Sequence, residues 1–395
     1  MKRIAIFFTV LILLFSGCND PVFYFISTQV PVPPPIIGGA PTDFVRIGDT
    51  LYVASNTTLY YYEEISKYGE KSAREGWKGI SLPYGRITYI AENSSTLYLL
   101  TQIEGLSRIY SSTSSPPVFS TLISNPDNLW LLSMYSAGSD IFIGARTRDD
   151  NEIYSVLRIN GGSLSPVSLN AGETNISKGF LRGVAHNGST YFFCIKDAVD
   201  DPPNRGGIFQ GSNSSANIIS SYGYPFLGII SNGGRVYAVQ NNYSSNRAAR
   251  LFSVTNSELL ESTVTLSMPS NGALFVSSAF NDSSKKLLLV GRQDILEYNT
   301  NTGFTYGYME IELTSTGALA TDAYFREPGI TAPSTLPVGT GHNDRFKTTL
   351  GKYPVRYFYE APNTGKTLFA SSQNYGIWSL KDRDQNGSPY WNTEN

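Results

Sequence analysis

The chain alternates short apolar runs with polar turns, and one version of this alternation recurs along most of its length. Each copy is a polar turn followed by two or more aliphatic or aromatic residues, as in Gly48–Ala54 and Asn93–Leu99. Short apolar runs bounded by turn residues indicate β-strands. Only residues 63–75 have a mildly helical pattern. The chain is therefore expected to be all-β.

The spacing of the copies indicates a repeat. The first apolar residues of the copies, called the anchor positions below, are Leu51, Leu97, Ile141, Tyr191, Val236, Leu287 and Leu368. Successive anchor positions lie 46, 44, 50, 45, 51 and 81 residues apart, and the last interval contains an insert at about 327–352. A period of about 45 residues with three or four short strands is typical of a β-propeller blade. Seven anchor positions predict a seven-bladed propeller over residues 44–395.

A pair of β-sandwich domains is the alternative fold, but sandwiches do not require one spacing to repeat so often. A propeller also has to close its ring. A strand from residues 23–30 or the tail after Trp378 is expected to complete a blade at the opposite terminus. The repeats resemble divergent propellers of the NHL and quinoprotein-like kind, without the fixed glycine pair or the cofactor signature of those groups.

Composition agrees with strands and turns. Charged residues make up 16% of the chain, and there are 26 Tyr and 21 Phe. Aromatic residues favour strands, and the low fraction of charged residues is unlike a chain rich in solvent-exposed helices. Without the first 17 residues, 28 Lys and Arg stand against 32 Asp and Glu. This slight acidic excess argues against a nucleic-acid surface, which needs a basic excess.

The first 17 residues have the features of a secretory signal. Lys2 and Arg3 precede an apolar run over residues 4–15, and two small residues, Ser16 and Gly17, precede Cys18. The run is shorter than the ~20 residues that span a bilayer, so removal is expected. Residues 14–18 (LFSGC) resemble the bacterial lipobox, with Phe15 where the family usually has Leu, as in the relaxed lipoboxes of spirochaetes. The resemblance implies lipidation at Cys18 and a membrane anchor.

Residues 18–43 follow as a predicted tether. They include Pro31, Pro33, Pro34 and Pro35 and then two glycines, and proline runs favour extended, semi-rigid chain. The expected architecture is a signal peptide over 1–17, a lipidated Pro-rich tether over 18–43 and the propeller.

One local motif resembles a metal loop. Asp382, Asp384 and Asn386 occupy positions 1, 3 and 5, and Gly387 position 6, as in the opening of a calcium loop. Position 12 is Thr393, so the bidentate acid is missing or displaced by one residue. The alternative is a polar hairpin turn that ends in Asn-Gly. Ca²⁺ is kept as a possible cofactor on this basis, and no other cofactor is indicated.

The remaining chemistry is sparse. The two histidines, His186 and His342, lie far apart without ligand spacing, and structural roles are favoured for both. Cys194 lies in a strand-like run and is expected to be a buried, unreactive thiol. No catalytic triad or phosphate loop can be assembled. The acidic loop 197–204 is interpreted as a solvent-exposed link between two strands, with ligand binding as the alternative. The insert 327–352 is the segment where a partner is expected to bind, since long loops are often functional.

These observations favour a non-enzymatic role. The expected function is that of an envelope lipoprotein of the outer membrane that binds a protein or glycan through its propeller. In this it resembles the spirochaetal surface lipoproteins, some of which are adhesins. The alternatives are a periplasmic scaffold or assembly factor and, less favoured, an envelope hydrolase or lyase. A charged, metal-filled axial pocket would favour the enzyme, and a plugged or apolar axis would favour binding.

Overall fold

The computed structural model describes most of the chain between residues 36 and 394. Within this range the described residues exclude 125–127, 150–151, 171–178, 198–206, 222–225, 233, 243–247, 256–257, 268–272, 283–284, 294–306, 315, 317–324, 327–349, 351–354, 366, 373–374 and 383–388. Residues 35–394 make up one compact unit. No helix within the described part of the chain is both long and apolar enough to span a membrane.

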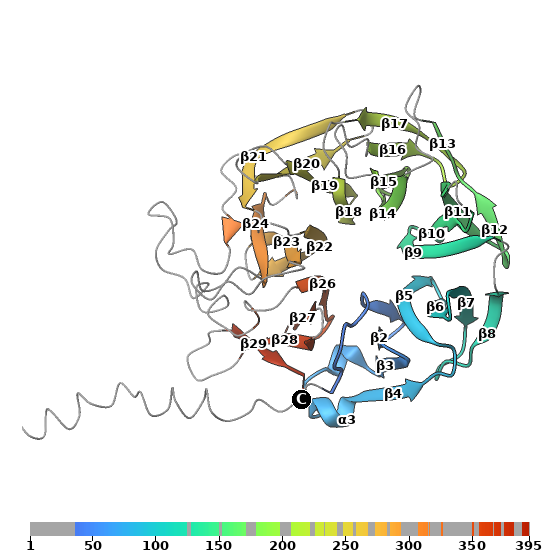
Figure 1. Cartoon of the computed structure of the whole chain (residues 1–395). Coiled ribbons are helices and arrows are strands. Elements are labelled where there is room, and N and C mark those ends of the chain that lie inside the picture. Colours follow the sequence, from blue (N-terminus) through green and yellow to red (C-terminus); the bar gives the residue numbers. More distant parts are fainter. Residues whose placement is uncertain are drawn as a thin grey trace, which may run out of the picture. The chain divides into compact units, whose positions relative to one another are not determined.

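Among the described residues, the strands form seven sheets that follow one another around an axis (Figure 1). Sheets one to three contain β1 (Val45–Ile47), β2 (Thr50–Ser55), β3 (Thr58–Tyr62) and β4 (Trp77–Ser81); β5 (Arg86–Asn93), β6 (Thr96–Ile103), β7 (Leu106–Ser112) and β8 (Ser120–Ser124); and β9 (Leu129–Ala137), β10 (Asp140–Thr147), β11 (Tyr154–Asn160) and β12 (Ser163–Pro166). Sheet four contains β13 (Ser168–Asn170), β14 (Gly179–His186), β15 (Tyr191–Asp197), β16 (Gly207–Gly211) and β17 (Ser215–Ser221).

Sheets five to seven contain β18 (Phe226–Asn232), β19 (Arg235–Asn242), β20 (Ala248–Val254) and β21 (Leu259–Ser267); β22 (Ala273–Asp282), β23 (Lys285–Gln293), β24 (Gly307–Leu313) and β25 (Phe325–Arg326); and β26 (Val355–Glu360), β27 (Leu368–Ser372), β28 (Gly376–Asp382) and β29 (Pro389–Thr393). All neighbouring strands pair antiparallel except β13, which lies parallel to β17. The 3₁₀-helix η1 (Ile65–Lys67) and the helix α3 (Ala73–Gly76) lie where the sequence is mildly helical.

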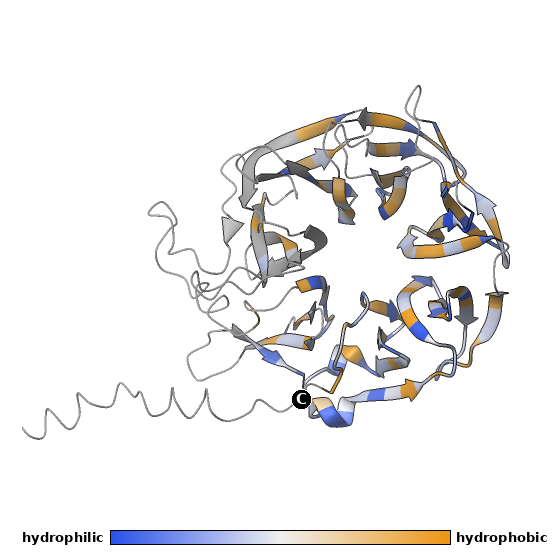
Figure 2. Cartoon of the chain, viewed as in Figure 1, coloured by the Kyte–Doolittle hydropathy of each residue, from blue (hydrophilic) through white to orange (hydrophobic). Residues whose placement is uncertain are grey.

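Each sheet buries its apolar residues against the next sheet. Every anchor position lies on the second strand of its sheet counted from the axis, and residues 141–145 of β10 and 368–372 of β27 are buried without interruption. Strands covered on both faces lose the alternation of a half-exposed strand. Six apolar clusters join neighbouring sheets within the described residues, and Figure 2 shows the hydrophobic residues concentrated along the strands. The all-β class and the propeller architecture are confirmed.

The ring is closed between the first and seventh sheets by side chains and a short backbone segment. The cluster at this junction contains Phe44 and Leu51 from the N-terminal side and Phe369 and Ile377 from the C-terminal side. The Ile36 N–H donates to the Glu394 carbonyl at 2.8 Å. No strand is exchanged among the described residues, since β1–β4 and β26–β29 each form a complete sheet from consecutive segments.

The expected fold, a seven-bladed propeller from residue 44 behind a free Pro-rich tether and closed by an exchanged terminal strand, therefore needs correction. The tail after Trp378 remains in its own sheet as β29, because that sheet has no vacant position for a strand from the other terminus. The end of the expected tether belongs to the propeller: Ile37 is fully buried, and Gly39 forms a parallel bridge with Tyr375. Burying this apolar segment stabilises the junction. Residues 23–30 lie outside the described residues.

Candidate functional site

A β-bulge recurs on the first strands of the sheets, which lie next to the axis. The pairing shifts between Leu181 and Gly183 on β14, which leaves Arg182 as the extra residue, and the same shift on β26 leaves Arg356. Corresponding shifts occur on β5, β9, β18 and β22, at Thr88, Leu132, Leu227 and Ser277. A bulge bends a strand and re-aims the side chain of the extra residue. The repeat thus gives six of the innermost strands one extra residue at the bulge.

The first strands surround an open axial cavity of about 450 Å³. Arg182, Leu227 and Arg356 are bulge residues that line it. Its other polar or aromatic lining residues are Asp43, Phe44, Arg46, Tyr89, Glu92, Tyr135, Ser136, Ser231, Tyr357 and Tyr359. A cavity of this size is within the range of ~300–1,000 Å³ typical of small-molecule sites. Six sheets line the cavity, and charged and aromatic groups from five of them meet in one concave site.

The two bulge arginines are partly buried and lie against aromatic rings. The Arg182 guanidinium carbon lies 4.6 Å from the Phe180 ring centroid, and that of Arg356 lies 5.3 Å from the ring of Tyr357. The Arg182 Nε is buried without a hydrogen-bond acceptor. Stacking on aromatic rings orients a guanidinium and leaves its edge free to donate hydrogen bonds.

Three tyrosines lie beside these arginines. The rings of Tyr89 and Tyr135 meet edge to face, with centroids 5.9 Å apart. Burial is the main cause that raises the pKa of Tyr135 and of Tyr357 above the usual range, so both phenols are neutral donors at physiological pH. The charge of Arg182, on the fourth sheet, opposes this rise at Tyr357, on the seventh sheet. The two residues therefore share one electrostatic environment across the axis.

Asp43 is an acid of the cavity lining that interacts electrostatically with Arg356. It precedes β1, and its Oδ1 accepts the Phe44 N–H at 2.7 Å. Asp43 is an exposed residue of the cavity lining, and desolvation of its carboxyl group by the surrounding protein raises its pKa to about 7, while the Phe44 hydrogen bond and the charge of Arg356 act in the opposite direction. Burial also raises the pKa of Glu92. The acids of the cavity are thus more easily protonated than free carboxylates.

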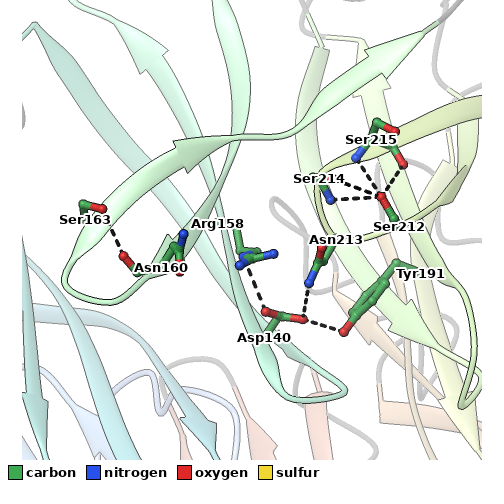
Figure 3. A network of polar contacts seen from close by, with 9 residues as sticks. All are labelled: Asp140, Arg158, Asn160, Ser163, Tyr191, Ser212, Asn213, Ser214 and Ser215. Atoms are coloured by element: carbon green, nitrogen blue, oxygen red, sulfur yellow. Dashed lines mark hydrogen bonds and ion pairs between the residues drawn. The ribbon is translucent and has the colours of Figure 1, made fainter.

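A second polar network links the third and fourth sheets away from the cavity lining (Figure 3). Asp140 Oδ2 accepts the Tyr191 hydroxyl at 2.5 Å and the Asn213 amide at 3.2 Å, while Asp140 Oδ1 lies 3.5 Å from the Arg158 Nε. Burial, followed by the hydrogen bond to Asp140, raises the pKa of Tyr191 to about 12. Asp140 is held by Arg158 of its own sheet and by Tyr191 and Asn213 of the fourth sheet, so this network serves as a structural link.

Those residues suggested by the sequence that the structure describes, Asp382, His186 and Cys194, are not brought together in one site. Asp382 ends β28, where its backbone pairs with Pro389, as expected for the hairpin alternative. Asp384 and Asn386 lie outside the described residues, so calcium binding stays a prediction. Cys18 and His342 also lie outside the described residues, as do 198–204 of the acidic loop and nearly all of the insert 327–352. No group of three or more His, Cys, Asp or Glu residues in the described part of the chain is placed to hold a metal ion.

His186 and Cys194 have structural surroundings. The His186 ring packs against Tyr191 with centroids 4.4 Å apart, and its Nδ1 accepts the Gly188 N–H at 3.4 Å. Cys194 is a fully buried free thiol, as predicted, and burial raises its pKa to about 12. A thiol with this pKa is almost entirely protonated at neutral pH and is a poor nucleophile.

The sequence analysis missed the axial residues. One signal was present: Arg182 and Arg356 each interrupt a strand-like apolar run, LRGV at 181–184 and VRYF at 355–358. In both runs the arginine is the extra residue of the bulge. These arginines can be assigned to the axis only when it is known which strand of each blade is innermost.

Comparison with known proteins supports the β-propeller fold and does not assign a function. No protein-family model and no curated protein matches the sequence. Among solved structures, the GH74 enzyme of Niastella koreensis matches at a TM-score of 0.54 and 14% identity over 92% of this chain, which spans only 55% of that enzyme. An oligogalacturonate lyase in complex with manganese matches at a TM-score of 0.52 and 11% identity, over 88% of this chain and 91% of the lyase. The β-propeller domain of the trilobed protease from Pyrococcus furiosus has a TM-score of 0.48 and 7% identity, over 91% and 98%. The β-propeller fold is thus shared by proteins of different activities and does not by itself assign one.

Proposed function

We propose that the protein is an envelope lipoprotein, held to the membrane through a lipid on Cys18, whose β-propeller binds a protein or glycan ligand in the axial cavity. The observation that supports binding is the convergence of Arg182, Arg356 and the cavity tyrosines from different sheets in an open space of about 450 Å³. Convergent polar groups on an aromatic lining are typical of a ligand site. The bulges place the two arginines without breaking the sheets, and the tyrosines lie on paired strands, so the site is built on rigid elements.

The cavity can be tested by filling it. Ser231 lines the cavity near the end of β18, and the next residue, Asn232, is exposed and does not line it. The substitution Ser231→Trp is expected to abolish ligand binding by the full chain, whereas Asn232→Trp is expected to leave it intact. Binding is followed by ligand-observed NMR against a panel of saccharides and peptides, with thermal melting to verify folding of both variants. Equal binding by the parent and both variants would place the ligand elsewhere.

Membrane attachment and orientation need separate tests. A Cys18→Ser variant is expected to leave the membrane fraction, since lipidation would require the thiol. Protease treatment of intact cells, with a known periplasmic protein as the control, separates the two faces of the outer membrane. Digestion of this protein while the control survives supports a surface binding role. Protection until the outer membrane is broken would refute the adhesin and leave the periplasmic scaffold.

One observation favours the enzyme alternative. The axis is open and charged, and it contains Asp43, whose pKa of about 7 is suited to proton transfer at neutral pH. If the protein is a hydrolase or lyase, a bound polysaccharide is expected to be cleaved, with new chain ends detectable by mass spectrometry. Asp43→Asn should then abolish cleavage while binding persists. Prolonged incubation that leaves every bound ligand intact supports the binding role.

A further inference from the structure

The cavity contains a cation that no acidic side chain neutralises among the described residues. Of the three arginines in its lining, Arg46 donates to the Gly48 carbonyl at 2.7 Å and lies 3.8 Å from Asp49, and Arg356 lies in the field of Asp43. Arg182 instead contacts the Phe180 ring, and its Nε has no acceptor. Buried donors without an acceptor are costly, so a site of this kind is completed by a ligand that brings one.

The net charge of the cavity indicates an anionic ligand. Three arginines line it against Asp43 and Glu92, and burial favours the neutral form of both acids. Arg182 and Arg356 act together on Tyr357, so an anion placed beside that ring would interact with both. A guanidinium donates two parallel hydrogen bonds to a carboxylate, which gives geometric selectivity as well as charge neutralisation.

The aromatic lining indicates what carries the anion. Tyr89, Tyr135, Tyr357 and Tyr359 line the cavity together with the hydroxyls of Ser136 and Ser231. An aromatic ring packs well against the C–H face of a sugar ring, and phenol and serine hydroxyls donate to and accept from sugar hydroxyls. A peptide would bring backbone amides, each of which needs its own partner in the cavity. A space of about 450 Å³ also excludes a folded domain and admits a small molecule or the end of a chain.

We propose that the axial cavity recognises a sugar acid, with Arg182 as the residue that holds the sugar's carboxylate and Arg356 as the second cation on the opposite side of the axis. This inference rests on the proposed binding function and adds the chemical class of the ligand. The carboxylate belongs either to a free sugar acid or to the end of an acidic polysaccharide, since both present the same group.

The test uses the full chain in detergent and titrates it with glucuronate, glucose, glucose 6-sulfate, a glucuronate-terminated oligosaccharide and a glutamate-containing tripeptide. Glucuronate is expected to bind at least about 10-fold more tightly than glucose, because a charge-assisted hydrogen bond is lost with the neutral sugar. A further gain with the oligosaccharide identifies the end of a polysaccharide as the source, and equal affinity identifies the free sugar acid. Tighter binding of the sulfate ester or the tripeptide would overturn the sugar-acid assignment.

Variants assign the carboxylate contact. Arg182→Gln is expected to weaken glucuronate binding about 10-fold or more and to change glucose binding little, and Arg182→Lys is expected to recover part of the loss. Arg86→Gln, at an exposed residue that begins β5 and lies outside the cavity lining, is the matched control. If Ser231→Trp blocks binding but Arg182→Gln does not discriminate between the two sugars, the cavity binds ligand and the carboxylate inference fails. If Ser231→Trp has no effect, the proposed function itself fails.

Discussion

The junction that closes the ring contains a buried carboxylate, and its removal should weaken the whole propeller. Glu394 is fully buried between the first and seventh sheets. Its carboxylate accepts hydrogen bonds from the Tyr68 hydroxyl, the Ser379 hydroxyl and, at 3.1 Å, the Trp77 indole N–H. Burial raises the pKa of Tyr68 above its usual range, followed by the effect of the Glu394 charge, so the phenol remains a donor.

The substitution Glu394→Ala removes one acceptor from three buried donors. An unsatisfied buried donor costs about 1–3 kcal/mol, and removal of one partner of a buried charged group costs about 3–5 kcal/mol. We expect the free energy of unfolding to fall by about 3–5 kcal/mol. A unit of 360 residues unfolds with an entropy near 0.75 kcal/mol/K, estimated at about 2.1 cal/mol/K per residue, so the melting temperature should fall by about 5 °C.

Glu394→Gln tests the charge and geometry separately. The amide oxygen of glutamine still accepts from Tyr68 and Ser379, but the amide nitrogen presents a donor to the donor of Trp77. The expected loss is intermediate, about 1–3 kcal/mol. Glu104→Gln, at an exposed turn residue, is the control and should not change the melting temperature.

The assay is differential scanning calorimetry of the full chain with each variant, combined with hydrogen exchange. Exchange should accelerate first in β1–β4 and β26–β29, which meet at this junction. A Glu394→Ala variant that melts within 1 °C of the parent, or one whose exchange increases uniformly around the ring, would refute the reasoning.

Three further predictions concern single titratable or charged groups. The pKa of Asp43 is about 7, so its carboxyl group becomes an anion beside Arg356 as the pH rises from 6 to 8, and the affinity for a sugar acid should decrease. The substitution Asp43→Asn should remove most of this pH dependence. Binding titrations at several pH values measure both effects. In a Cys18→Ser background, Cys194 should resist alkylation in the native state and react only after unfolding, followed by mass spectrometry; rapid native labelling would contradict its burial. If the calcium motif is functional, Ca²⁺ should raise the melting temperature of the parent and not of Asp384→Ala, and an equal response of both would exclude this site.

Local pattern was sufficient to predict the class of fold. The recurring turn and apolar run place each anchor position on the second strand of a sheet, because a blade must bury both faces of that strand against its neighbours. The mild helical pattern at 63–75 and the buried position of Cys194 follow from the same local reasoning. These features depend on residues close in sequence, so the pattern of apolar and polar residues along the chain predicts them.

Ring closure and the axial site depend on residues that the chain brings together from far apart. Tyr68 and Glu394 meet at the junction although 326 residues separate them, and no local pattern distinguishes this glutamate from an exposed one. Ile37 belongs to the core for the same reason, although a proline run precedes it.

The axial cavity shows most clearly which features the sequence predicts and which depend on the tertiary structure. The amino-acid sequence by itself determined the repeat, the strands and the scarcity of histidine and metal-ligand spacing. Only the tertiary structure decided that the bulges of β14 and β26 direct Arg182 and Arg356 toward one space with Asp43 and the tyrosines. A bulge shifts a side chain by an amount that depends on strand pairing, and pairing around a ring is settled by packing among all the sheets at once.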